Sequence, residues 1–111
     1  MSKREAQRFE IVSGRVAGLS YHVGHEEVVA LLPTNTPLQL VREPTNAHDG
    51  NAVRLDVSGR KIGYVPATMS RMIAALIDNG YDVRGHILSN SGAAVEMSAF
   101  VVLTLPKLSQ V

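Results

Sequence analysis

Residues 38 to 57 carry the clearest alternation of polar and apolar positions in this chain. From Leu38 to Glu43 the alternation has a period of two, which predicts a strand with two distinct faces. Pro44 lacks a backbone N–H and favours extended geometry in the residue before it, so ladder pairing should stop there. Alternation resumes from Ala52 to Val57. The pattern therefore predicts a strand, a polar corner and a second strand.

The polar corner, residues 45 to 51, is longer than a change of direction requires, because an Asn-Gly pair alone can reverse a hairpin. Asn46, Asp49, Gly50 and Asn51 are residue types that bond nearby backbone groups or accept positive φ angles. The corner also places the imidazole of His48 next to the carboxylate of Asp49. We therefore predict that the polar corner is the functional site.

Before this region the sequence predicts mostly extended chain. Residues 9 to 16 alternate as a first strand, and Gly18 marks a bend or bulge beyond which the chain should stay extended. Residues 24 to 33 have an acidic start and an apolar end, which suits a short helix that stops at Pro33. The paired valines of that segment would equally suit a strand. Residues 34 to 37 are expected to turn into the central strand.

After the second strand, residues 58 to 61 predict a hairpin into a strand that ends at Pro66. Apolar residues at three- and four-residue intervals from Met69 to Ile77 predict an amphipathic helix of about three turns. Gly80 is a natural C-terminal cap, and Met69 and Met72 are expected to fill the core. Two more strands follow, Asp82 to Leu88 and Ala94 to Leu105, joined by a loop at 89 to 92.

Short strands separated by turns, with one clear helix late in the chain, favour a mainly β fold. We expect a small, curled antiparallel β-barrel, or a sandwich, with one or two helices. At 111 residues the chain is one domain. That domain is expected to cover residues 9 to 105, between a frayed polar segment at 1 to 8 and a tail at 106 to 111.

Composition narrows the classes of function. A net charge of +1 is too small for binding phosphate backbones through a global field, so any nucleic acid would be held by a local patch. The chain has no cysteine and no apolar leader, which agrees with a reducing compartment. Its apolar runs are too short to cross a membrane. A cytoplasmic protein that does not bind membranes is expected.

Metal binding and catalysis have little support in the sequence. His22, His25 and Glu26 have the spacing of metal ligands but lack the cysteines of common zinc sites, so we expect neither a metal nor another cofactor. His48 and Asp49 are adjacent, and adjacent residues of an extended chain seldom point the same way. No nucleophile motif, Walker motif or carboxylate pair accompanies them. We expect a protein that is not an enzyme.

The corner and its flanking strands resemble the HIRAN domain. The resemblance is carried by the pattern Arg42-Glu43-Pro44-x-Asn46-x-x-Asp49-x-Asn51-Ala52-Val53 and the later Gly59-Arg60-Lys61-Ile62-Gly63-Tyr64-Val65-Pro66. Residues 16 to 21 and 76 to 80 also fit, so the resemblance covers roughly residues 9 to 103. It implies a barrel related to the OB-fold, a class that often binds oligonucleotides.

In HIRAN domains of fork-remodelling DNA translocases, the resemblance implies a pocket for the 3′ end of single-stranded DNA. Tyr21 would stack on a base, His48 would stack or donate a hydrogen bond, and Asp49 would accept one from the 3′-OH. The other candidate contacts are Ser20, Asn46, Asn51 and Tyr64. Asp49, Asn46 and Asn51 would also suit a structural role as backbone caps, and Tyr64 a partly buried position.

Three positions depart from the family pattern. Ser20 stands where the DNA-end binder has a basic residue, Ala67 where a lysine would reach phosphate, and Val95 roughly where another aromatic ring would stack. Losing two cations removes salt-sensitive affinity. The candidate replacements for the lost phosphate contacts are Arg42, Arg60, Lys61 and Arg71.

We therefore expect a non-catalytic DNA-binding module that recognises single-stranded 3′ ends in DNA repair or replication-fork processing. Helicases or nucleases would be its partner proteins. The alternative is a protein-interaction or assembly module on the same barrel, in which the polar corner is only structural. A third hypothesis, a small hydrolase that uses His48, requires a pocket beside that imidazole.

Overall fold

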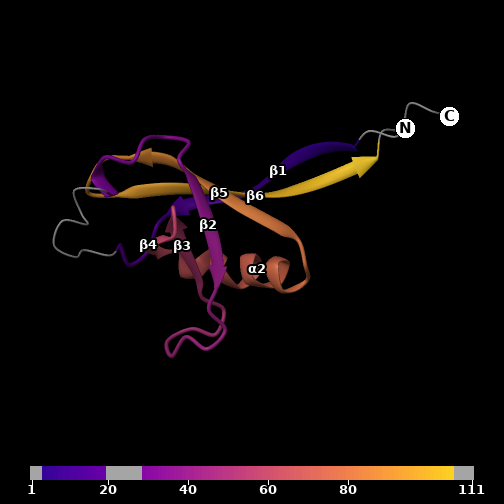
Figure 1. Cartoon of the computed structure of the whole chain (residues 1–111). Helices are drawn as coiled ribbons and strands as arrows, with labels where there is room; N and C mark the ends of the chain where they lie inside the picture. Colours follow the sequence, from indigo (N-terminus) through magenta and orange to yellow (C-terminus); the bar gives the residue numbers. More distant parts are fainter. Residues whose placement is uncertain (1–3, 20–28, 107–111) are drawn as a thin grey trace.

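The computed structural model describes residues 4–19 and 29–106 (Figure 1). Six strands form one antiparallel sheet in the order β1-β6-β5-β2-β3-β4, and one helix, α2, packs against it. The elements are β1 (Arg4–Arg15), β2 (Pro37–Arg42), β3 (Val53–Val57), β4 (Arg60–Tyr64), α2 (Ala67–Asp78), β5 (Asp82–Asn90) and β6 (Val95–Pro106).

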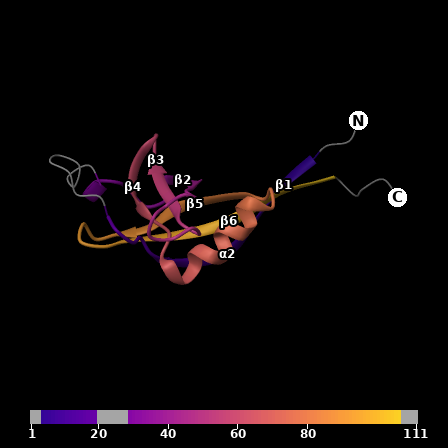
Figure 2. The ribbon, with the colours of Figure 1, turned by 90° about the horizontal axis from the view of Figure 1, so that it is seen from below.

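The sheet is curled, and its two edges meet at one point (Figure 2). Just after β1, the backbone of Ala17 exchanges two hydrogen bonds with Tyr64 at the end of β4, with N···O distances of 2.9 and 2.8 Å. Gly63 permits this approach, because a Cβ there would lie 2.6 Å from the carbonyl oxygen of Ala17. The predicted curled, mainly β fold is confirmed, although within the described residues only this bridge closes the sheet.

The core lies between the inner face of the sheet and α2. Leu55, Ile62, Ile87 and Met97, from four different strands, are buried together with Ile73 of α2. Full burial of a side chain of this size stabilises the fold by about 1.5–3 kcal/mol. These contacts hold β3, β4 and the start of α2 in a fixed arrangement around the polar corner.

Both predicted hairpins are present. In the first, β2 pairs with β3 so that Leu40 faces Leu55 and Arg42 faces Val53. In the second, Ser58 and Gly59 turn β3 into β4 with φ angles of 50° and 79°, the left-handed pair that tight hairpins use. The polar corner therefore connects two paired strands.

The helix and its predicted end are also confirmed. Gly80 has a φ of 87°, and its N–H donates to the carbonyl of Ile77 at 3.0 Å. The next N–H, from Tyr81, donates to the carbonyl of Leu76 at 3.1 Å. This pair of bonds is the Schellman arrangement, which a glycine at this position favours.

The prediction that both methionines of α2 fill the core is right for Met69 and wrong for Met72. Met69 is buried, whereas Met72 is 43% exposed. The buried stripe of α2 runs through residues 69, 70, 73 and 74. Position 72 falls outside this stripe, because each residue advances about 100° around a helix.

Two strands extend past their predicted ends by two residues or more. β1 begins at Arg4, so residues 4 to 8 pair with β6 where their polar composition predicted a frayed segment. Ladder bonds join backbone groups, and the long β6 supplies a partner regardless of side-chain polarity. β5 runs past Leu88 to Asn90 through an irregularity between Ile87 and Ser89, and β6 begins at Val95, so the loop lies at residues 91–94 and not at 89–92.

Other predictions fall on residues outside the described ranges. The extended segment after Gly18 is described only to Leu19, and of the segment 24 to 33, predicted as a short helix, only the end is described, where Val29 and Ala30 are helical. The tail is described only at Pro106, which ends β6.

β1 and β6 extend beyond the rest of the sheet (Figure 1). β5 pairs with β6 only as far as the Asp82–Val102 pair, whereas β1 continues along β6 to the Arg4–Pro106 pair. Residues 4–7 and 103–106 thus form a two-stranded terminal ribbon. The radius of gyration is 15.7 Å, and the longest dimension is 58 Å. A compact chain of this length would have a radius of gyration of about 13 Å.

Candidate functional site

A cavity of about 410 Å³ opens between the polar corner, β4 and the start of α2. Its volume is within the usual range of small-ligand sites. The lining includes Asn46, His48 and Asp49 of the corner, Lys61 and Tyr64 of β4, and Ala67 of α2. The structure therefore brings together four of the seven candidate DNA-contacting side chains, and also Lys61 from the candidate phosphate contacts.

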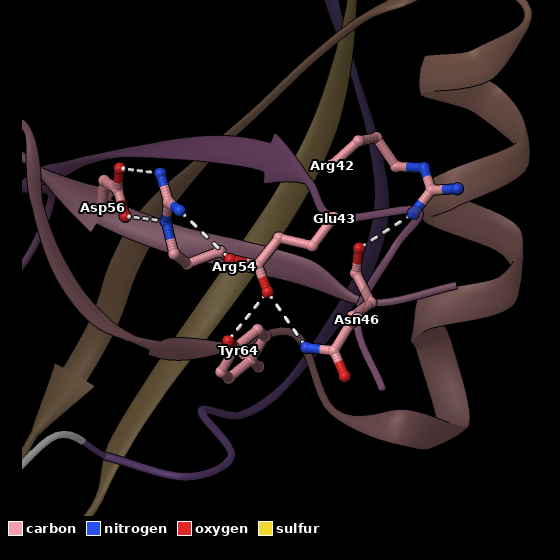
Figure 3. Close-up of polar contacts among 7 residues, drawn as sticks. Arg42, Glu43, Asn46, Arg54, Asp56 and Tyr64 are labelled. Carbon is pink, nitrogen blue, oxygen red and sulfur yellow. Dashed lines mark hydrogen bonds and ion pairs between the residues drawn. The ribbon is translucent and has the colours of Figure 1, made fainter. Parts of the chain in front are cut away.

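The carboxylate of Glu43 organises one side of the cavity (Figure 3). Its Oε1 accepts hydrogen bonds from the Asn46 side-chain amide at 3.0 Å and the Tyr64 hydroxyl at 2.8 Å. Its Oε2 accepts one from the Arg54 guanidinium at 3.1 Å. These donors, with Asn46 contributing most, hold the pKa of Glu43 below its ordinary value. Glu43 therefore stays ionised and fixes two residues that line the cavity.

Asn46 shapes the corner. While its amide nitrogen donates to Glu43, its side-chain oxygen accepts the backbone N–H groups of His48 at 2.9 Å and Asp49 at 3.2 Å. Both ends of the side chain are thus committed within the protein. The structural role that the sequence left open for Asn46 is the one its contacts support.

The carboxylate of Asp49 makes structural contacts and can still accept a further hydrogen bond. Its Oδ1 accepts the backbone N–H of Asn51 at 2.8 Å, and its Oδ2 accepts the Ser70 hydroxyl at 3.3 Å. That hydroxyl also lies 3.2 Å from the Ala67 carbonyl oxygen, so its one proton is shared between two acceptors. A carboxylate has about four lone-pair sites, which leaves Asp49 able to accept a further hydrogen bond inside the cavity.

Tyr64 and Lys61 act as a pair. The Lys61 ammonium lies 4.6 Å from the centre of the Tyr64 ring, a cation–π arrangement. Because the Tyr64 hydroxyl donates to Glu43, the ring is the part of this residue that remains for a ligand. Among the residues that the structure describes, Lys61 is the one cationic side chain that lines the cavity.

Arg42 is occupied by other residues of the chain. Its guanidinium donates to both carboxylate oxygens of Asp78 at 2.9 and 3.1 Å, and to the carbonyl of Ala52 at 2.9 Å. The hydrogen bond to Asp78 is the main reason that the pKa of Arg42 is raised. These contacts tie the two ends that flank the corner, at Arg42 and Ala52, to the end of α2. Arg60 and Arg71 are exposed and lie outside the cavity lining.

The other positions singled out in the sequence lie in different surroundings. Ser20 and Tyr21 lie outside the described residues, as do His22, His25 and Glu26. Asn51 is exposed and outside the cavity lining, and its backbone N–H is held by Asp49. Val95, which stands roughly where the family pattern has a stacking aromatic ring, is a fully buried core residue. Ala67 lines the cavity and carries no charge.

Sequence reasoning missed Glu43 and Ser70 as members of the site. The alternation places Glu43 at the end of one predicted strand and Arg54 in the next, and predicts no link between their side chains. Alternation was the available signal, because the β2–β3 hairpin brings residues near 43 alongside residues near 53. Arg54 also donates to both oxygens of the buried Asp56 at 2.8 and 3.0 Å, which locks its position.

Comparison with known proteins gives a consistent result. Residues 9–106 match the family model of the HIRAN domain. Two proteins named helicase-like transcription factor are similar over 72 residues, or 64% of this chain. The one from Oryctolagus cuniculus is 32% identical and matched over 7% of its length, and the one from Homo sapiens is 29% identical and matched over 6%.

A third relative, from Arabidopsis thaliana, is named a putative SWI/SNF-related matrix-associated actin-dependent regulator of chromatin subfamily A member 3-like 1. It is 28% identical over 88 residues, which cover 78% of this chain and 9% of that protein. This chain therefore spans less than a tenth of the length of each of these three relatives.

Two solved structures share the fold. A protein from Lactobacillus plantarum superposes with a TM-score of 0.77 at 18% identity, covering 88% of this chain and 98% of that one. The HIRAN domain of human HLTF superposes with a TM-score of 0.65 at 20% identity, covering 88% and 79%. Within the described residues, no helix is long and apolar enough to cross a membrane.

Proposed function

Since this chain belongs to the HIRAN domain family, we propose that it is a non-catalytic module that binds single-stranded DNA at a free 3′ end. The observation that carries the proposal is the cavity in which His48, Asp49, Tyr64 and Lys61 meet. An aromatic ring, an imidazole, a carboxylate and one cation suit a terminal nucleotide with a free hydroxyl. We place this activity in DNA repair or replication-fork processing.

Each lining group has a role in this proposal. The Tyr64 ring and the His48 imidazole stack on the terminal base or sugar, because flat side chains contribute about 1–3 kcal/mol per stacked base. Asp49 accepts the hydrogen bond of the 3′-OH with its remaining lone pairs. A carboxylate repels phosphate, so a hydroxyl end is favoured over a phosphorylated one.

Lys61 is the proposed contact for the first phosphate. Lys61 lines the cavity, and Ala67, which stands where the family pattern has a lysine, lines it too. We propose that Lys61 takes the place of that missing cation. With one cation at the cavity, the affinity should depend only weakly on salt, because a single strand releases about 0.7 counter-ions per neutralised phosphate. Arg60 and Arg71 are proposed only as outer contacts along a longer strand. We propose Ser20 and Tyr21 as further ligand contacts from the family pattern.

Partner proteins are inferred from the relatives. These include helicase-like proteins in which the matched region is a small fraction of the length. We propose that this module brings DNA ends to proteins with helicase or nuclease activity. The module itself holds the end and does not cleave it.

The test is fluorescence anisotropy with one short single-stranded DNA in three forms: free 3′-OH, 3′-phosphate and circular. The free 3′-OH form should bind most tightly at low and at higher salt. Asp49→Asn should remove the preference for 3′-OH over 3′-phosphate, while the amide oxygen still accepts the Asn51 N–H and preserves the corner. Asp49→Ala is less informative because it also removes that structural acceptor.

Two outcomes would contradict the proposal. Equal binding of all three forms would remove the end-specific role of Asp49. No binding of any form at low salt would favour a protein-interaction module, in which the network around Glu43 only stabilises the corner.

A further inference from the structure

Within the part of the chain that the structure describes, β1 is paired along one side only. β1 is the last strand in the sheet order, and within the described residues no other strand pairs with its free side. It contains 12 residues, more than twice the length of β3 or β4. A long open edge presents unpaired N–H and C=O groups that can template pairing with another chain.

The first residues of β1, which extend beyond the rest of the sheet, are stabilised by pairing with β6 alone. Among the described strands none pairs with the terminal ribbon as a third strand, because pairing between β5 and β6 stops at the Asp82–Val102 pair. An isolated two-stranded ribbon is only marginally stable in water, and a third strand on its edge would stabilise it. Phe9, two residues after the ribbon, faces Val101 of β6 and is 45% exposed.

The charges on this edge are self-complementary. Arg8 and Glu10 lie on the same face of β1, and their side chains are 2.8 Å apart. If two copies pair antiparallel about a two-fold axis at Phe9, Arg8 of each copy faces Glu10 of the other. An axis at Arg8 would oppose two arginines, and an axis at Glu10 would oppose two glutamates. Opposite charges across a ladder stabilise it, and like charges weaken it.

Both charged side chains are already held in place. The Arg8 guanidinium lies 3.9 Å from the centre of the Phe100 ring and hydrogen-bonds His86 with an N···N distance of 2.8 Å. Glu10 accepts the Ser98 hydroxyl at 2.7 Å. Side chains fixed before association lose less conformational entropy when a partner binds.

We propose that a second copy of this chain occupies the open edge, so that two β1 strands pair antiparallel about Phe9 and form one continuous sheet. The interface is isologous, because each copy contributes the same residues. β1 shifts register relative to β6 between Glu10 and Val12, which limits the regular part of the ladder to residues near the axis. Association is therefore modest and depends on concentration. The described residues of β1 do not line the cavity, whose nearest member along the chain is Ala17, eight residues after the proposed axis at Phe9, so both copies keep their sites.

The test uses the absence of natural cysteine from the chain. Phe9→Cys places two thiols opposite each other at the axis, where directly opposed strand residues have Cα atoms about 4.5–5.5 Å apart, within disulfide range. Mild oxidation should yield a covalent dimer from Phe9→Cys. The matched control is Leu31→Cys, at an 82% exposed position outside the strands, which should stay monomeric.

Sedimentation equilibrium of the unmodified chain gives the second readout. Its mass should rise with concentration from 12.0 kDa toward twice that value. Phe9→Lys, which places two ammonium groups at the axis, should hold the mass at that of one chain, while Leu31→Lys should not. Circular dichroism checks that each variant is folded. A monomer at every concentration, or equal cross-linking from positions 9 and 31, would overturn the proposal.

Discussion

At the scale of single residues, the side chain of Glu43 joins three segments around the site. One carboxylate serves Asn46, Tyr64 and Arg54, which lie on the corner, β4 and β3. Such a buried or half-buried network is worth most when every member is satisfied. The residues that would touch the ligand are therefore positioned by one that does not line the cavity.

Glu43→Gln should lower the free energy of unfolding by about 1–3 kcal/mol at neutral pH, because an amide has one acceptor oxygen for three donors. The folded-state pKa of Glu43 is lowered, first by the Asn46 hydrogen bond. Its stabilisation is therefore complete above the ordinary glutamate value of 4.5 and is lost as the pH falls through the lower folded pKa. Urea denaturation at neutral and acidic pH should show the difference between variant and wild type shrinking in acid.

The control is Glu96→Gln, which neutralises an exposed glutamate on β6. It should change the stability little at either pH. A Glu43→Gln deficit that is the same in acid and at neutral pH would mean that the charge of Glu43 is not what stabilises the corner.

The sequence alone located the corner but did not show which residues hold it together and which are left for a ligand. Turn chemistry identified Asn46 and Asp49 because such residues bond nearby backbone, and both do. It could not show that Glu43 joins three segments, since that depends on the β2–β3 and β3–β4 registers. Arg42 was expected to be available for phosphate, but its partner Asp78 is 36 residues away and no local pattern links them.

At the scale of elements, patterns with a regular period were the most predictable. α2 followed from apolar spacing and a glycine cap, and both hairpins followed from alternation and turn residues. The first half of β1 did not, because residues 4 to 8 lack an apolar pattern and are extended through backbone pairing with β6. Pairing of this kind depends on a strand that lies almost the whole chain away.

Gly80→Ala should destabilise the protein by about 1 kcal/mol, because the φ of 87° at the end of α2 suits glycine. A Cβ at this position would meet no atom within 4 Å, so the cost comes from the backbone alone. Gly80→Asn should cost less, since asparagine tolerates the left-handed region better than alanine. Thermal unfolding of the two variants compares them directly, and equal losses would point to a cause other than φ.

At the scale of the whole molecule, the cavity depends on how the sheet curls. Its lining comes from the segment after β1, the polar corner, β4 and α2, which span residues 17 to 67. The strand order makes β1 and β4 the opposite edges, and within the described residues the backbone bridge between them joins Ala17, just after β1, to Tyr64 of β4. The sequence predicted a curled barrel, but the closing contact is a backbone pairing between distant segments and has no side-chain signature.

Gly63→Ala tests whether this closure supports the site. Its Cβ would lie 2.6 Å from both the Ala17 carbonyl oxygen and a methyl carbon of Val16, too close for either to remain in place. The expected cost is about 1–3 kcal/mol, as for other overpacked positions. Because Tyr64 follows directly and forms the bridge, the variant should bind all forms of single-stranded DNA more weakly. Asp49→Asn, in contrast, should affect only the discrimination between ends.

Gly50→Ala is the matched control in the corner itself, since a Cβ there would make only an ordinary contact of 3.8 Å with the Pro44 carbonyl oxygen. If Gly63→Ala lost stability but bound DNA like the wild type, the cavity would not depend on closure of the sheet, and β3, β4 and α2 alone would define it.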